Sequence, residues 1–288
     1  SGHNEAVYVR PEAMETVLNY YKQNPEEAKK EFGDNPYELK NILAHWVRAP
    51  KDAGLQMIPT DSIVIKLDKE AIKRSGMLTP DSIPEYMHIL LKGKSVLYKS
   101  ELMMLEMLAN TNWERPMYMA ITVGSDNHLN LTDNFLQEGL AYRITPFNNT
   151  ELGRRLDSEK MYDNLMHKFR FGGLDKPGLY LDETVMRMCY THRQTFATLI
   201  MALLKEGKKQ QALQALQYCK KVLPSYNVPY DVMSVGFDYD NGLFEIPEAW
   251  RQVGRPQESE RILLAMGKNL RQYMDWYNSL GGRIVSYG

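Results

Sequence analysis

The sequence lacks any apolar run that approaches the roughly 20 residues needed to cross a bilayer as a helix. Its N-terminus also lacks the charged, apolar and small-residue regions of a signal peptide. Neither sign of charge predominates, because 35 Lys and Arg balance 36 Asp and Glu. The long-range positive field typical of nucleic-acid-binding proteins is therefore absent, and we expect no nucleic-acid partner.

The commonest catalytic signatures are missing as well. There is no Gly-x-Ser-x-Gly elbow, no Gly-x-Gly-x-x-Gly or Walker phosphate loop, and no His-Glu-x-x-His zinc motif. The two cysteines, Cys189 and Cys219, lie in helical patterns rather than at metal or redox spacing, which predicts buried small side chains, with a disulfide as the alternative. The sequence thus predicts no catalytic residue, no cofactor and no metal.

What the sequence does contain is the balance of a soluble globular chain, with 43% apolar and 25% charged residues in 288. The first fifty residues predict short helices, opened by Pro11, by Pro25 and by Asn35-Pro36. From residue 58 the spacing of apolar residues changes to that of strands, which are predicted at 63–67, 117–123 and 140–147. Two further strands, at 87–91 and 96–98, are predicted to pair as a hairpin. Ser100 is predicted to cap a helix over 101–109.

After Gly178 the pattern is helical throughout. Asp182 is predicted to cap a long helix to Lys205, followed by a turn at Gly207 and a partner helix over 210–222. The spacing of apolar and small residues in this pair resembles a tetratricopeptide repeat. A second, looser unit turns at Gly254, and Pro247 predicts that its first helix begins late or kinks.

The predicted fold class is therefore α+β, with an N-terminal mixed α/β part that contains a small sheet and an all-α, tetratricopeptide-like C-terminal part. The predicted divisions are a helical lead-in over 3–57, a mixed α/β domain over 58–180 and a helical domain over 181–288.

Two polar clusters are candidates for ligand binding. Trp113 and Arg115 offer an indole beside a charge, on which a sugar ring could stack, although a core tryptophan at a helix-to-strand corner explains the same residues. Asp126 and His128 follow a predicted strand and could bind a metal or act as an acid–base pair, although a turn also favours these residue types. Tyr142 and Arg143 would line the same binding site as these residues if their strand is adjacent to that of Tyr118.

Two further segments carry residue types suited to binding. Phe196, Leu199 and Leu203 are candidates for a peptide-binding groove on the helical hairpin. Residues 238–242 carry oxygen ligands before a glycine but lack the distal glutamate of a calcium loop, which makes calcium a minor alternative.

One stretch resembles a known family. The corner Asn112-Trp113-Glu114-Arg115-Pro116, followed by Gly139-Leu140-Ala141-Tyr142-Arg143, is similar to the C-terminal region of bacterial multi-spanning membrane proteins of domain-of-unknown-function family 2723. The similarity covers most of the chain after about residue 58. It extends less sharply through 160–162, 171–173 and 187–193.

The resemblance implies a membrane glycosyltransferase of the C type, similar to protein O-mannosyltransferases, which transfers a lipid-linked sugar to proteins. Its catalytic carboxylates would lie in a membrane-embedded half that this sequence does not contain. The start Ser1-Gly2-His3 looks like a cloning remnant, and we expect a piece of a longer protein. The expected role is a noncatalytic domain on the periplasmic side of a bacterial inner membrane, which binds a protein or peptide acceptor or supports the membrane part. A glycan is a further candidate partner. The alternatives are a free-standing scaffold or a carbohydrate-binding domain.

Overall fold

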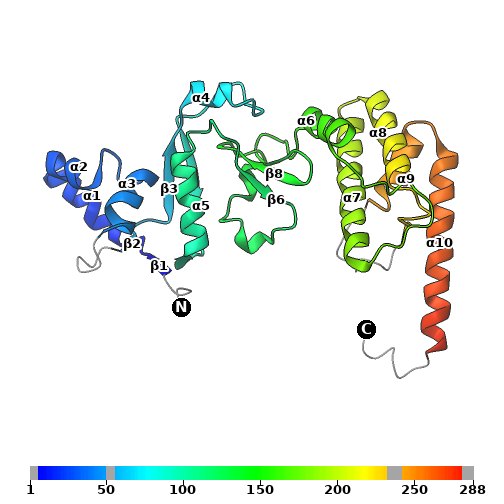
Figure 1. Ribbon diagram of the computed structural model, residues 1–288. Helices are drawn as coiled ribbons and strands as arrows, with labels where there is room; N and C mark the ends of the chain where they lie inside the picture. The colour runs from blue at the N-terminus through cyan, green and yellow to red at the C-terminus, as the bar shows by residue number, and fades with distance from the viewer. Residues whose placement is uncertain (1–5, 50–55, 232–241, 281–288) are drawn as a thin grey trace. The chain divides into compact units, whose positions relative to one another are not determined.

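The computed structural model describes residues 6–49, 56–231 and 242–280 (Figure 1). These residues form two compact units. Unit 1 contains the described residues up to Gln137 together with Ala141–Leu156, and unit 2 contains Glu138–Leu140 and the described residues from Asp157 onward. Unit 1 holds the small sheets and unit 2 is helical, which confirms the predicted α+β class.

The three predicted N-terminal helices of unit 1 are present. They are α1 (Ala13–Gln23), α2 (Pro25–Phe32) and α3 (Leu39–Ile42), and α3 continues as a π-helical turn over Leu43–Val47. α2 begins at Pro25 itself, whereas α1 and α3 begin two and three residues after Pro11 and Pro36. Phe32 stacks on Trp46 with ring centroids 5.0 Å apart. Together with buried Met14 and Val17, this pair forms a small core that holds the helices against one another.

Three small sheets complete unit 1. In the first, β1 (Ala6–Val9) lies between parallel β2 (Met57–Ile58) and antiparallel β5 (Val96–Tyr98). In the second, β3 (Ser62–Lys66) pairs antiparallel with β4 (Tyr86–Leu90). In the third, β8 (Ala141–Ile144) lies between β6 (Tyr118–Ala120) and β7 (Phe135–Gln137). Tyr118 is opposite Arg143, so the adjacency on which a shared site for Tyr142 and Arg143 depended is present.

The predicted hairpin is wrong, although both of its strands exist. β4 pairs with β3, and β5 pairs with β1, a strand that the sequence pattern did not indicate. Residues 92–95 therefore connect two sheets instead of turning within one. Period-2 patterning identifies a strand but not its partner, because the pairing is decided by residues far away in the chain.

The remaining helices of unit 1 begin at identifiable caps. α4 (Lys69–Arg74) follows Asp68, whose carboxylate accepts the backbone N–H groups of Glu70 and Ala71. α5 (Lys99–Asn110) begins earlier than predicted, with Tyr98 rather than Ser100 at its cap position. Glu101 stabilises the N-terminus of α5, because its Oε2 accepts the Tyr98 N–H at 2.9 Å while its Oε1 forms an ion pair with Lys94.

Unit 2 is built from helices that pack on one another (Figure 1). α6 (Ser158–Asp163) runs into a π-helical turn over Asn164–Lys168, and α7 (Glu183–Lys205) is capped by Asp182 as predicted. α8 (Lys209–Val222), α9 (Glu245–Gln252) and α10 (Pro256–Ser279) follow. α9 begins late, so that Pro247 lies in its first turn, where its missing N–H costs no helical hydrogen bond.

The two cysteines of unit 2 are free and buried, on α7 and α8. Among the described helices, none combines the length and the apolar character needed to cross a membrane.

Candidate functional site

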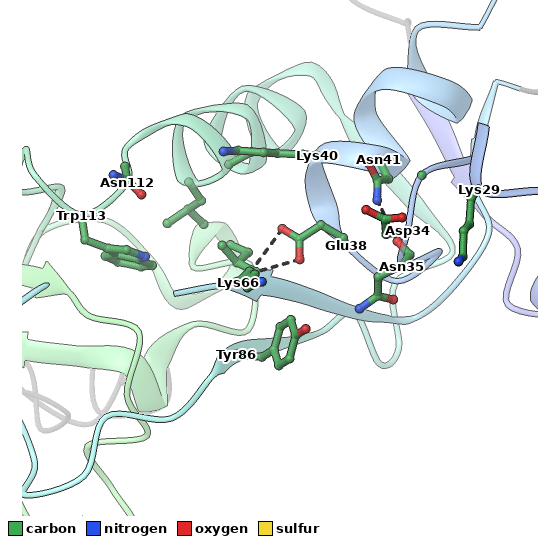
Figure 2. Close-up of a pocket in the computed structure, with 14 residues that line it drawn as sticks. Lys29, Asp34, Asn35, Glu38, Lys40, Asn41, Lys66, Tyr86, Asn112 and Trp113 are labelled. Atoms are coloured by element: carbon green, nitrogen blue, oxygen red, sulfur yellow. Dashed lines mark hydrogen bonds between the residues drawn. The ribbon is translucent and has the colours of Figure 1, made fainter. Parts of the chain in front are cut away.

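A polar cavity of about 450 Å³ opens in unit 1 (Figure 2). It is lined by the turn between α2 and α3, by α3 itself, by β3 and β4, and by the end of α5. The residues that carry its chemistry are three lysines, two carboxylates, three amides and two aromatic rings: Lys29, Lys40, Lys66, Asp34, Glu38, Asn35, Asn41, Asn112, Tyr86 and Trp113. A buried apolar wall of Ile65, Leu108 and Ala109 completes the lining.

Glu38 lies at the centre of this lining, and the backbone fixes its place. The Val64 N–H donates to the Tyr37 carbonyl at 2.9 Å, which ties the residues before α3 to β3. Two residues further along β3, the Lys66 N–H donates to both carboxylate oxygens of Glu38, at 3.1 and 3.3 Å. The side chain of Glu38 is thus held in one position before any ligand arrives.

The electrostatic environment of Glu38 is mixed. Burial raises the pKa of its carboxyl above the usual value, and the Lys66 N–H and the charges of Lys40 and Lys66 oppose that shift without cancelling it. Lys40 and Lys66 are exposed, and within the described ranges neither forms a salt bridge. Lys29 makes only a long contact of 3.8 Å with Glu26. A half-buried carboxylate therefore faces lysines that remain free to bind something else.

The corner at Asn112 and Trp113 forms the other end of the cavity in Figure 2. Both residues adopt left-handed backbone conformations, with φ of 45° and 61°. Such a conformation is costly for a bulky residue and persists only where the surroundings enforce it. Here the Asn112 side chain hydrogen-bonds the carboxylate of Asp68. The Ala71 backbone N–H is the main cause that lowers the pKa of that carboxyl, and the hydrogen bond from Asn112 adds to it. The Trp113 side chain is only 3% exposed.

Of the six predicted ligand-binding residues, only Trp113 lines this cavity. Arg115 and Asp126 are exposed, and Asp126 lies in a 3-10 turn. His128 is buried and its Nε2 lies 2.9 Å from the Val123 carbonyl oxygen, a contact that closes the turn. The six predicted ligand-binding residues therefore do not line one common site.

Tyr142 and Arg143 point away from each other, as neighbours on a strand do. Tyr142 stacks on Phe135 with ring centroids 5.4 Å apart, and His128 contacts the same ring edge-on at 5.0 Å. Arg143 is 1% exposed and donates to the Ser75 carbonyl at 2.9 Å. These side chains serve the packing of unit 1 in the structure as it stands.

The predicted peptide groove consists of fully buried side chains. Phe196, Leu199 and Leu203 lie on the inner face of α7 with no exposed surface. A peptide could reach them only if the helices separated, so binding there remains a prediction without an open surface to support it.

Sequence reasoning missed Glu38, Lys40 and Lys66, because nothing in their local pattern distinguishes them from a solvated helix start and a strand end. The only local clue was the Asn35-Pro36 turn that places Glu38 just before α3. No group of three or more histidine, cysteine or acidic side chains suited to a metal occurs in the described part of the chain. Residues 238–241 of the considered calcium loop lie outside the described residues.

The family model described as TMEM260-associated domain 2 matches residues 1–162, a range that includes every residue of the cavity. No curated protein and no solved structure matches the chain.

Proposed function

Because the chain belongs to the TMEM260-associated domain 2 family, and is thus a domain associated with a TMEM260-type membrane protein, we propose that it is the noncatalytic, extracytoplasmic domain of a membrane glycosyltransferase. In that role it binds the acceptor protein or supports the membrane-embedded part. The periplasmic side of a bacterial inner membrane is its proposed location.

The family match over residues 1–162 is the observation that carries this proposal. The resemblance at Asn112-Trp113-Glu114-Arg115-Pro116 supports it, since that motif lies inside the matched range. The absence of the common catalytic motifs from the sequence agrees with a part that assists chemistry performed elsewhere.

Fractionation of the source cells tests the association with a membrane protein. An antibody raised against this chain should detect a band far larger than 33.3 kDa that requires detergent for extraction. A band near 33.3 kDa that is extracted without detergent would instead favour a free-standing binding scaffold.

Sugar transfer by the full-length protein tests the rest of the proposal. We expect that deletion of this domain reduces transfer to protein acceptors while transfer to water or to a short peptide persists. Equal transfer to protein acceptors with and without the domain would refute a role in acceptor binding or support.

A further inference from the structure

We propose that the cavity around Glu38 is a binding site for a neutral, hydroxyl-rich ligand, a short saccharide of one or two rings. The inference extends the proposed function and rests on it only for the biological source of such a ligand. All residues that line the site lie in unit 1.

The charges of the lining select against an ionic ligand of either sign. An anion that approached Lys40 and Lys66 would also approach the carboxylates of Glu38 and Asp34. A cation that approached those carboxylates would meet three lysines. A hydroxyl group avoids this conflict, because it donates to a carboxylate and accepts from an ammonium group at the same time.

The hydrogen-bonding capacity left over in the cavity suits several hydroxyls. Asn35 uses its Oδ1 to accept the Tyr37 N–H at 3.0 Å, which leaves its amide N–H groups to donate. In Figure 2 the Asn35 amide nitrogen and the Tyr86 hydroxyl point into the space below the Glu38 carboxylate. From the described residues Glu38 accepts one backbone N–H, that of Lys66, and it retains lone pairs for further donors.

The size and the wall of the cavity fit a ring with apolar C–H faces. Its volume of about 450 Å³ lies within the range of small-molecule sites. Ile65, Leu108 and Ala109 form the buried apolar wall. The buried Trp113 indole and the half-buried Tyr86 ring also line the cavity. Because Trp113 is almost fully covered, it supports the wall rather than serving as an open stacking platform.

The alternative is that these groups are merely a solvated surface hollow. Against this, the Glu38 carboxylate is half-buried, fixed by two contacts to one N–H, and flanked by two lysines that form no salt bridge in the described part of the chain. A structural carboxylate at such a depth ordinarily recruits a neighbouring cation as its partner.

Binding can be measured directly on the whole chain by nuclear magnetic resonance of its backbone amides. The probes are neutral hexoses and hexose disaccharides, with the matching uronic acid and hexose phosphate as charged counterparts. We expect the neutral disaccharides to shift the amide signals of Glu38, Lys66 and Asn112 in a saturable manner. No shift with any probe, shifts confined to other residues, or tighter binding of the phosphate or uronic acid would each overturn the proposal.

Three variants locate the binding. Lys40→Ala and Tyr86→Phe should each weaken binding by about tenfold, since each removes one hydrogen-bonding group. Glu38→Gln keeps the shape and an acceptor for the Lys66 N–H while it removes the charge, and it should weaken binding similarly. Lys30→Ala is the matched control, because Lys30 is an exposed lysine on α2 outside the lining.

If the control weakens binding as much as Lys40→Ala, the cavity is not the site. The outcomes for the two proposals remain separable. If the chain binds saccharides but deletion of the domain does not change transfer, this inference is retained and the proposed function is refuted. If deletion reduces transfer but the chain binds no saccharide, the proposed function is retained and this inference is refuted.

Discussion

Both carboxylate oxygens of Glu38 lie within hydrogen-bonding distance of the Lys66 backbone N–H, at 3.1 and 3.3 Å. The two residues are 28 positions apart in the sequence. Their contact joins the start of α3 to the end of β3 and places a carboxylate inside the cavity. The cavity therefore depends on the same pairing that holds two parts of unit 1 together.

Glu38→Gln should stabilise unit 1 slightly at neutral pH. The folded-state pKa of Glu38 is raised mainly by burial, so the fold disfavours the charged form that exists at pH 7. This cost is absent at pH values below the pKa that Glu38 has in the unfolded state. It grows as the pH rises through the higher pKa that Glu38 has in the folded state. Because the site is partly solvated, the gain should stay below about 1 kcal/mol. Chemical denaturation of both proteins from pH 4 to pH 7 checks this, and a variant that is less stable at pH 7 would contradict it.

Trp113→Ala should destabilise unit 1 by about 3–5 kcal/mol, because it leaves a cavity behind a nearly fully buried indole. Circular dichroism during denaturation measures the loss. Arg115→Ala is the control, since Arg115 is exposed two residues away and should change stability by less than about 0.5 kcal/mol. A Trp113→Ala protein of normal stability would show that the indole is a surface platform after all.

Arg193→Lys should destabilise unit 2. The guanidinium of this fully buried residue donates to the carbonyls of Val228 and Pro229 and lies 4.1 Å from the centroid of the Tyr230 ring. Lysine keeps the charge but cannot reproduce the planar fork or the stacking, so we expect a loss of about 2–4 kcal/mol in thermal or chemical unfolding. Arg187→Lys, on the exposed face of the same helix, should cost almost nothing. Equal losses of stability in the two variants would argue against a specific role of the Arg193 guanidinium in holding residues 228–230.

Gly242→Ala and Gly254→Ala separate backbone strain from steric clash. Both glycines have left-handed φ, of 69° and 79°. A methyl group on Gly254 meets nothing within 4 Å, whereas one on Gly242 would lie 2.6 Å from the Cβ of Ala197. We expect a loss of about 1 kcal/mol for Gly254→Ala and about 1–3 kcal/mol more for Gly242→Ala, measured by thermal denaturation. Similar losses would mean that α7 shifts to accommodate the methyl group.

Cys189 and Cys219 should resist alkylation in the native protein. Burial raises the pKa of both thiols, that of Cys219 to about 12, so the reactive thiolate is scarce and shielded at pH 8. Labelling with iodoacetamide, followed by mass spectrometry, should show two modified cysteines only after denaturation. Rapid labelling of the native chain would contradict the buried placement, and no labelling after denaturation would indicate a disulfide.

The sequence predicted features whose causes act within a few residues. Pro25 opens α2 and Asp182 caps α7, because the missing N–H of proline and the reach of a short carboxylate are local effects. Local reasoning also found Trp113 as a notable residue. It could not find Glu38 or Lys66, whose importance arises only when the residues before α3 pair with β3.

The sequence by itself determined where several helices begin, among them α2 at Pro25 and α7 after Asp182, and that sheets precede a helical unit. It also located the strands β3, β4 and β5. Only the tertiary structure decided that β5 pairs with β1, that the six predicted ligand-binding residues do not share a site, and that a carboxylate and free lysines line one cavity. The physical reason is that helix initiation and strand alternation are properties of neighbouring residues. Strand pairing, burial and shared cavities depend on which distant side chains the folded chain brings together.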